Sequence, residues 1–376
     1  MSLLGNPYVD EDHNFGLALS GGGVRAMAFH AGVLLYFSER DYMERVGHIS
    51  SVSGGSLLIG LVYKKNSYQW PSSDQYRSHT FESIKAELCS KSIQRKMLQQ
   101  LFYPDNWKYF LSRANVLAKV IEREWGIEGA VGEIDSYPLW SINGTTAENG
   151  KRFRFKHDTF GDYSLGYSNS GEFLLSEALA ISAAFPGGIG PLVIDASKFT
   201  WKKRKRWSDP PGSEVVIEPE FKKLHIYDGG VYDNLGSEPL FDPGKGIPKY
   251  EDMLIMVSDA GLPLKKGFGG SRLNPFRLKR IVDIAMEQSR ALRVRSLMAY
   301  LLDNPGYGAY MMIGQHPKEV LEDRRFNEDI WQSPEEVKAA SEYDTNLRQM
   351  EPEDFDRIAR HGYELIKAVD IRKAGW

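Results

Sequence analysis

The chain contains two successive copies of a short apolar stretch, a glycine-rich turn and a helix. Residues 15–20 are apolar, Gly21-Gly22-Gly23 interrupts them, and apolar residues then recur with helical spacing over 24–37. The second copy has its apolar stretch at 46–52 and its turn at Ser53-Gly54-Gly55. Glycine at such junctions ends the strand and lets strand and helix approach closely. Units of this kind are typical of layered α/β folds, in which helices cover a sheet of mostly parallel strands.

The rest of the chain extends this pattern. Strands are predicted at 140–145, 152–157, 224–227 and 253–258, and helices at 176–185 and 276–302. Residues 64–135 are helical in pattern and rich in aromatic residues, which indicates a helical insertion or cap, and 334–376 indicates a C-terminal helical tail. The stretch 197–223 is polar and basic and is expected to be a loop. We therefore expect residues 1–376 to form a single domain with three αβα layers.

Composition narrows the functional classes. The chain has 376 residues, of which 42% are hydrophobic, which is enough for a sizeable core. The net charge of −3 argues against a surface built for nucleic acid. Cys89 has no second cysteine to pair with, which fits a reducing compartment. The sequence predicts neither a signal peptide nor a spanning helix, because the apolar residues 24–37 are too few and include charge. We expect a cytoplasmic protein whose contact with membranes is peripheral.

Ser53 is the candidate nucleophile. It follows an apolar strand on a turn of small residues, as acyl-transfer chemistry requires of a reactive serine. The usual elbow pattern G-x-S-x-G has glycine two residues before the nucleophile, whereas Ser51 stands there in this chain. Asp228 is the candidate base, because it directly follows the predicted strand 224–227, at the edge of the sheet where α/β active sites lie. A glycine–serine turn and an Asp-Gly turn are the alternative readings of these two short runs.

Gly21-Gly22-Gly23 is the candidate oxyanion hole. It lies at a strand-to-helix junction, where unpaired amide N–H groups favour an anion. The same residues fit the dinucleotide pattern G-x-G-x-x-A, with Ala26 as the last position. That fold needs an acidic residue at the end of the second strand, and Ser53-Gly54-Gly55 stands there instead. The sequence therefore favours the oxyanion hole.

Three runs of this sequence together resemble the patatin-like phospholipase family, which includes relatives of cytosolic phospholipase A2. They are Leu19-Ser-Gly-Gly-Gly-Val-Arg-Ala-Met27, Ser51-Val-Ser-Gly-Gly-Ser56 and Asp228-Gly-Gly-Val-Tyr-Asp-Asn234. Helix 176–185 with Pro186 is similar to the family's A-x-x-A-x-P segment. The resemblance implies that Ser53 is the nucleophile, Asp228 the base and Gly21 to Gly23 the oxyanion donors. It also implies that Arg25 holds the loop or the substrate phosphate.

A Ser-Asp dyad is weighed against a triad with histidine. The histidines after Asp228 that could complete a triad are His316 and His361, and both are expected on the solvated surface. A carboxylate with an ordinary pKa of about 4 is ionised at neutral pH and can accept the proton directly. The sequence therefore predicts a dyad.

The run Trp201 to Trp207 contains five successive cations between two tryptophans. Such a composition suits an anionic membrane surface, and its place just before Asp228 predicts that it lies beside the active site. A solvated loop and a nucleic-acid contact are the alternatives.

The function predicted from these features is hydrolysis of fatty acyl esters of phospholipids or lysophospholipids, without cofactor or metal. Two alternatives keep the same fold. One is a phospholipase effector in signalling or defence that a ligand or partner activates, and the other is a non-catalytic lipid-binding protein. The intact residues Ser53, Asp228 and Gly21 to Gly23 favour an enzyme.

Overall fold

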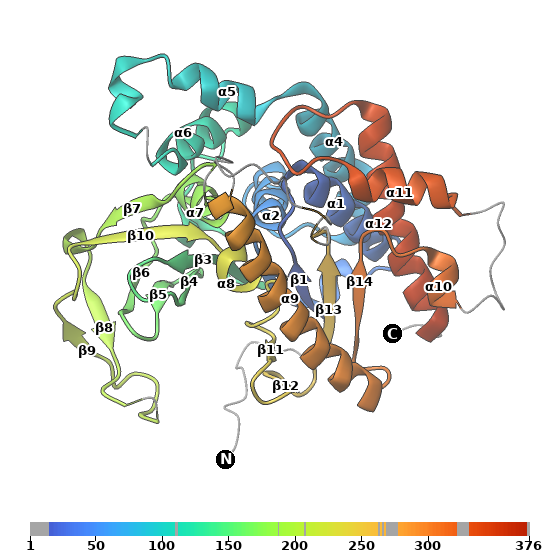
Figure 1. The fold of residues 1–376 in the computed structure, drawn as a ribbon. Helices are drawn as coiled ribbons and strands as arrows, with labels where there is room; N and C mark the ends of the chain where they lie inside the picture. The colour runs from blue at the N-terminus through green and yellow to red at the C-terminus, as the bar shows by residue number, and fades with distance from the viewer. Residues whose placement is uncertain are drawn as a thin grey trace.

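The computed structural model describes residues 15–109, 112–186, 188–206, 208–261, 264, 267, 277–321 and 331–373. In this part of the chain a mixed β-sheet lies between two layers of helices (Figure 1). The three-layer α/β fold predicted from the sequence is therefore confirmed. In the same part of the chain no helix is both long and apolar enough to span a bilayer.

The sheet has 12 strands in the described residues. They are β1 (Phe15–Leu19), β2 (Val46–Ser51), β3 (Leu139–Thr146), β4 (Arg152–Phe155), β5 (Thr159–Asp162), β6 (Gly166–Asn169), β7 (Leu192–Asp195), β8 (Trp201–Lys203), β9 (Val215–Ile217), β10 (Lys223–Asp228), β13 (Leu254–Asp259) and β14 (Gly308–Met312). Their order is β14-β13-β1-β2-β3-β4-β5-β6-β8-β9, and β10 pairs with β3 and β7. Neighbours from β14 to β3 are parallel, whereas the pairs beyond β3 are antiparallel. Strands β11 (Phe241–Asp242) and β12 (Ile247–Pro248) form a separate ribbon.

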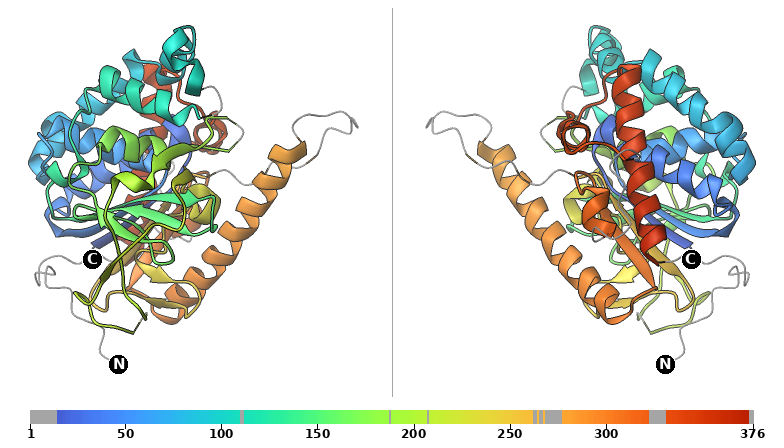
Figure 2. Two further views of the ribbon diagram at one scale, coloured as in Figure 1. Left: turned by 90° about the vertical axis from the view of Figure 1, so that its left-hand side faces the viewer. Right: turned by 90° about the vertical axis from the view of Figure 1, so that its right-hand side faces the viewer.

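Helices connect and cover these strands (Figures 1 and 2). They are α1 (Gly23–Glu39), α2 (Gly54–Lys65), α3 (Ser73–Gln75), α4 (Phe81–Ser90), α5 (Ile93–Gln100), α6 (Ala114–Trp125), α7 (Leu175–Ser182), α8 (Gly230–Asp233), α9 (Arg277–Asp303), α10 (Pro317–Leu321), α11 (Pro334–Glu342) and α12 (Pro352–Lys373). Figure 2 shows α9 on one side of the sheet and α1 and α2 on the other.

Strand β1 shows why the sheet is covered on both faces. Its five residues are all buried, as expected for a central parallel strand. Leu17 and Leu19 belong to the core beneath α1, α2 and α7, whereas Ala18 points to a second core that includes Leu297 of α9. We call the face toward α1 the first face and the face toward α9 the second face. The two cores fix the sheet between its helical layers.

The C-terminal helix packs against the first helix rather than standing apart as a tail. A methyl group added to Gly32 of α1 would lie 1.8 Å from the main-chain oxygen of Ala359, and one added to Gly362 of α12 would lie 2.0 Å from that of Phe29. Only glycine allows so close a crossing. Phe355 of α12 is fully buried. Within 334–373 the chain forms α11 and α12, and α12 contributes to the core.

The expectation of a loop over 197–223 is wrong, because β8 and β9 lie within it. These strands have three residues each, too few for an alternating pattern to show in the sequence. Strands β5, β6, β7 and β14 also lacked a recognised signal. Long helices and buried strands were therefore easier to predict than the short antiparallel strands at one end of the sheet.

Candidate active site

Ser53 lies on a strained turn between β2 and α2. Its φ of 50° and ψ of −118° place a non-glycine residue in a region that L-amino acids rarely adopt. Gly54 makes this turn possible, since a methyl group there would lie 2.3 Å from the main-chain oxygen of Gly23. The first turn of α2 thus touches the Gly21–Gly23 loop. The strain holds the Ser53 side chain outside the helix, at its N-terminal end.

A chain of hydroxyl groups supports this turn from below. The Trp140 indole N–H donates to the Ser51 hydroxyl at 2.8 Å. Ser51 and Ser56 lie 2.8 Å apart, as do Ser56 and Ser182, and the Ser182 hydroxyl donates to the main-chain oxygen of Asn143 at 2.7 Å. Because each hydroxyl has one proton, the donation runs in one direction from Trp140 to Asn143. Ser51, which replaces the usual elbow glycine, is thus a member of this chain.

Asp228 ends β10 and is almost fully buried. Burial raises the pKa of its carboxyl to about 7, although hydrogen bonds from the Gly230 N–H, at 2.6 Å, and from the Ser53 side chain oppose the rise. The expectation of an ordinary pKa near 4 is therefore wrong. A carboxylate with this higher pKa is a stronger base. It also accepts a hydrogen bond from the side chain of the candidate nucleophile, Ser53.

The three glycines of the loop differ in what their N–H groups can do. The Gly21 N–H donates to the main-chain oxygen of Asn234 at 3.2 Å. Among the described residues, the hydrogen bonds include none donated by the N–H of Gly22 or Gly23. Gly22 is also the partly exposed member of the three. The available amides are therefore those of Gly22 and Gly23, next to the N-terminal end of α1, where a negative charge is favoured.

Arg25 is buried beneath the loop, with an exposed fraction of 1%. Its guanidinium donates to three main-chain oxygens, those of Ala260 at 2.9 Å, Tyr343 at 2.7 Å and Ser341 at 3.4 Å. Of the two expectations for Arg25, loop support matches these contacts, since the side chain ties α1 to segments far along the sequence.

Neither candidate histidine lines the pocket at Ser53. His361 was expected at the surface, but it is fully buried, its Nε2 accepts from the Gly314 N–H at 2.9 Å, and burial lowers its pKa to about 4. His316 Nε2 lies 3.1 Å from the main-chain oxygen of Gln332. The polar residues around His361 in the sequence predicted an exposed side chain. It is buried because α12 turns it toward Phe29 of α1.

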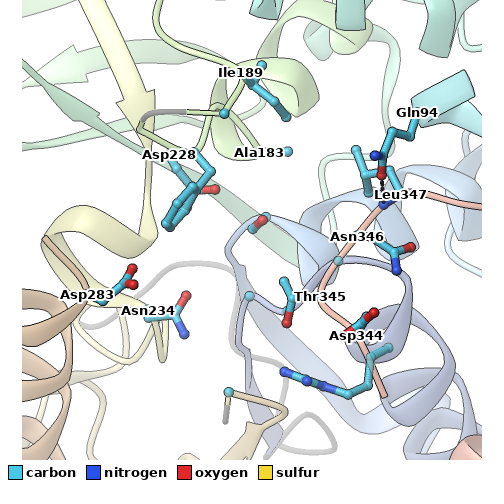
Figure 3. Close-up of a pocket in the computed structure, with 18 of the residues that line it drawn as sticks. Gln94, Ala183, Ile189, Asp228, Asn234, Asp283, Asp344, Thr345, Asn346 and Leu347 are labelled. Atoms are coloured by element: carbon cyan, nitrogen blue, oxygen red, sulfur yellow. Dashed lines mark hydrogen bonds between the residues drawn. The ribbon is translucent and has the colours of Figure 1, made fainter. Parts of the chain in front are cut away.

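Ser53, Asp228 and the glycine loop line one pocket of about 870 Å³. Figure 3 shows Asp228, Asn234 and Asp283 on one side of it and the segment Asp344 to Leu347 on the other. Further lining residues come from the segment 93–113, from α9 and from the loop between α7 and β7. They include Gln94, Met97, Leu98, Leu101, Arg113, Met286, Arg290 and, in that loop, Ile189. A pocket of this size and mixed lining suits an amphiphilic molecule.

The segment Asp344–Arg348 is a part of the site that the sequence did not indicate. The Val24 N–H donates to the Asn346 oxygen at 2.9 Å, and the Gln94 N–H donates to the Leu347 oxygen at 2.8 Å. The segment thus connects the start of α1 with α5. Local patterns could not reveal this role, because the contacts are main-chain bonds to residues hundreds of positions away. Asn234 and Ser182 were also missed as individual residues, although both lie within or beside the recognised runs.

The basic run at 201–206 is not among the residues that line the pocket. Trp201 is buried, with an exposed fraction of 1%, and its ring packs 5.5 Å from that of Phe160. Arg204 pairs with Glu214 at 3.3 Å. Trp207 lies outside the described residues. The expectation that Trp201 contacts a membrane beside the active site is therefore wrong, because its β8 partner strands draw it into the core.

A family model described as patatin-like phospholipase matches residues 17–241, which contain both Ser53 and Asp228. The chain belongs to this family. No curated protein sequence matches the chain. The human GIVD cytosolic phospholipase A2 is similar in structure, with a TM-score of 0.55, 15% identity and coverage of 97% of this chain and 61% of that chain. VipD from Legionella pneumophila matches with a TM-score of 0.39, 14% identity and coverage of 96% of this chain and 67% of that chain.

The structural similarity to the human enzyme covers 97% of this chain, whereas the family model matches only residues 17–241. This patatin-like chain spans about three-fifths of the length of that relative. The resemblance inferred from the three sequence motifs is confirmed.

Proposed function

We propose that this patatin-like protein hydrolyses fatty acyl esters of glycerophospholipids, with Ser53 as nucleophile and Asp228 as base. The observation that carries the proposal is the strained Ser53 turn beside a buried carboxylate whose pKa is raised to about 7, both facing one pocket. Family membership supports lipid hydrolysis in general. Beyond lipid hydrolysis in general, the proposal assigns the Ser53–Asp228 dyad and a phospholipid substrate.

The reaction has two halves. Asp228 accepts the Ser53 proton while the serine oxygen attacks the ester carbonyl carbon, and the N–H groups of Gly22 and Gly23 bind the oxygen that becomes negative. Collapse of this intermediate breaks the ester bond, and the departing alcohol takes the proton from Asp228. Water then attacks the acyl-serine, again with Asp228 as base, and releases the fatty acid.

Apolar side chains beside the pocket support a substrate that arrives from a bilayer. Leu98 of α5 and Phe102, just after this helix, have exposed fractions of 53% and 82%, and Ile281 and Ile284 of α9 have 61% and 41%. Leu98 itself lines the pocket. Exposed apolar side chains beside a binding site mark surfaces that meet lipid or another apolar partner. Lipid contact is therefore proposed at this rim rather than at 201–206.

A fluorophosphonate probe tests the proposal, because it labels an activated serine without any assumption about the substrate. We expect labelling of the purified protein and hydrolysis of phospholipid vesicles, both abolished by Ser53→Ala. Ser213→Ala, which removes an exposed serine far from the pocket, should leave both unchanged. Equal labelling of the Ser53→Ala protein would refute the assignment. Absence of labelling and hydrolysis in the unmodified protein would favour a lipid-binding role.

A further inference from the structure

Two arginines project from the second face of β4. Arg152 and Arg154 alternate with Phe153 and Phe155, which are fully buried in the core on the first face, and alternation along a strand places both arginines on the other face. Lys156 directly follows this strand, and its charge acts on the same neighbours. Lys249, which follows β12, lies near them, and we call these four residues the basic sheet face. None of them lines the Ser53 pocket.

The four charges share a small volume. Burial and the neighbouring Arg154 and Arg152 lower the pKa of Lys156 to about 8, and burial together with Arg152 lowers that of Lys249 to about 8. The register of the sheet agrees, since Arg154 is paired with Asn143 and Arg152 with Thr145 on the adjacent β3. The cations are thus crowded on one part of the sheet.

These cations lack the partners that other buried arginines have. The Nη1 atom of Arg152 and the Nε atom of Arg154 are buried without a hydrogen bond. Among the described residues, no ion pair is found for any of the four side chains. By contrast, Arg290 pairs with Asp259 at 2.5 Å. Buried donors without partners cost folding free energy, and an anion bound beside them would supply the missing acceptors.

Nearby acidic groups do not neutralise the basic sheet face. Burial and Arg154 lower the pKa of Arg152, and Glu238 and Asp233 oppose this lowering, but Arg293 pairs with both acids, at 2.9 Å and 3.6 Å. Asp158 acts on Lys156 and Asp242 on Lys249, yet the pKa of each lysine remains lowered. After these acidic groups are taken into account, the basic sheet face keeps a net positive charge.

Aromatic rings border the basic sheet face. The Arg154 guanidinium lies 4.8 Å from the centre of the Tyr167 ring, and the Tyr250 ring lies 5.3 Å from that of His48. The guanidinium contact orients Arg154 without using its hydrogen-bond donors. Arginine donors are suited to the oxygens of phosphate, which accept several hydrogen bonds at once.

We propose that the basic sheet face binds an anion that carries phosphate. The four cations outnumber the acidic groups beside them that no other cation pairs with, and the guanidinium groups of Arg152 and Arg154 each keep a donor without a protein acceptor. The site is separate from the Ser53 pocket, so this inference does not depend on the proposed hydrolysis. A soluble pyrophosphate compound and a phosphorylated lipid head group present the same chemistry.

Calorimetric titration with inorganic pyrophosphate tests the proposal. We expect saturable binding that weakens as salt is raised and that falls about 100-fold in the variant Arg152→Gln with Arg154→Gln, because each charged hydrogen bond contributes about tenfold or more. The matched control is Lys222→Gln with Lys338→Gln, which removes the same charge from exposed lysines. The control should bind as the unmodified protein does. Equal binding by all three proteins would overturn the proposal.

Proton uptake gives a second measurement that a nonspecific charge effect would not reproduce. At pH above 8 part of Lys156 and Lys249 is unprotonated, so a bound anion should draw protons onto them. Titrations in two buffers of different ionisation enthalpy should show this uptake, and Lys156→Gln with Lys249→Gln should abolish it. Uptake that persists in this variant would refute a role for the lysines.

Vesicles distinguish the two sources of phosphate. If pyrophosphate binds and vesicles of phosphatidylcholine with phosphatidic acid do not, the ligand is a soluble compound. If the unmodified protein binds these vesicles and the variant Arg152→Gln with Arg154→Gln does not, the ligand is a lipid head group. If neither probe binds the unmodified protein, the proposal is wrong.

Discussion

The main-chain N–H of Ser53 donates to two oxygens of Ser182, the hydroxyl at 3.0 Å and the main-chain oxygen at 3.1 Å. The Ser182 hydroxyl also lies 2.8 Å from the Ser56 hydroxyl, so α7 holds both the turn and the first residues of α2. Backbone strain at a reactive residue persists only where surrounding contacts enforce it. Helix α7 therefore supports the turn that carries the candidate nucleophile.

Replacing Ser182 by alanine should weaken both the fold and the reaction. The Ser56 hydroxyl would lose its acceptor, and a buried unpaired group of this kind costs about 1–3 kcal/mol of unfolding free energy. Denaturant titration measures that cost, and the rate of fluorophosphonate labelling measures the effect on Ser53. Ser213→Ala is the control for loss of an exposed hydroxyl. An unchanged labelling rate would mean that the turn does not depend on this contact.

The reaction should depend on pH through Asp228. Its pKa of about 7 means that the base is half protonated at neutrality, so turnover should be half-maximal near pH 7 and level off about one unit above it. Asp228→Asn should lower turnover by about 100-fold or more. A rate that stays constant between pH 5 and 8 would contradict the raised pKa.

The same shift has an opposite effect on stability. Between the ordinary value of 3.8 and about 7 the folded protein binds more protons than the unfolded chain, so the unfolding free energy should fall as pH rises through that range. Denaturant midpoints measured at several pH values would show this slope. Asp228→Asn should reduce it, and an identical slope in that variant would assign the titration to another group.

Gly22→Ala should impair the oxyanion hole. The added methyl group would lie 3.0 Å from the Ala260 oxygen at a φ of +152°, so the N–H groups would shift, and loss of one donor costs about 100- to 1000-fold in turnover. Gly150→Ala is a matched control, because Gly150 also has a positive φ and nothing lies within 4 Å of its methyl position. Normal turnover in Gly22→Ala would refute the role of this amide.

Arg25→Lys distinguishes support of the loop from recognition of phosphate. A lysine cannot reproduce the three hydrogen bonds to main-chain oxygens, so the unfolding free energy should fall by about 2–4 kcal/mol. The ratio of KM values for a phospholipid and an uncharged ester should not change. A selective rise in KM for the phospholipid would show that Arg25 binds the substrate phosphate.

The apolar rim and the basic run make different predictions for activity on membranes. Phe102→Gln with Tyr103→Gln should lower hydrolysis of vesicles about tenfold or more but spare a soluble short-chain ester, since burying one large apolar side chain contributes about 1.5–3 kcal/mol. Replacing the five cations Lys202 to Arg206 by glutamine should have little effect on either substrate. The reverse result would return the lipid contact to 202–206.

The parts of the site that could be predicted lie where a strand, a turn and a helix follow one another directly in the sequence. Ser53 and the glycine loop each follow a buried strand and begin a helix, so composition and spacing over a few residues reveal them. The bond from Val24 to Asn346 and the raised pKa of Asp228 could not be predicted in this way, because they arise from packing between distant segments. His361 shows the same limit, since polar neighbours in sequence did not reveal its burial by α1.

Asn346 also determines when the site is complete. During synthesis the ribosome produces Ser53 and Asp228 long before Asn346, whose oxygen holds the start of α1. A nascent chain with a finished nucleophile turn still lacks the contact that fixes Gly23 beside it. The partly made protein should therefore be unreactive toward the lipids around it, and the order of translation itself would delay the activity until the fold has closed.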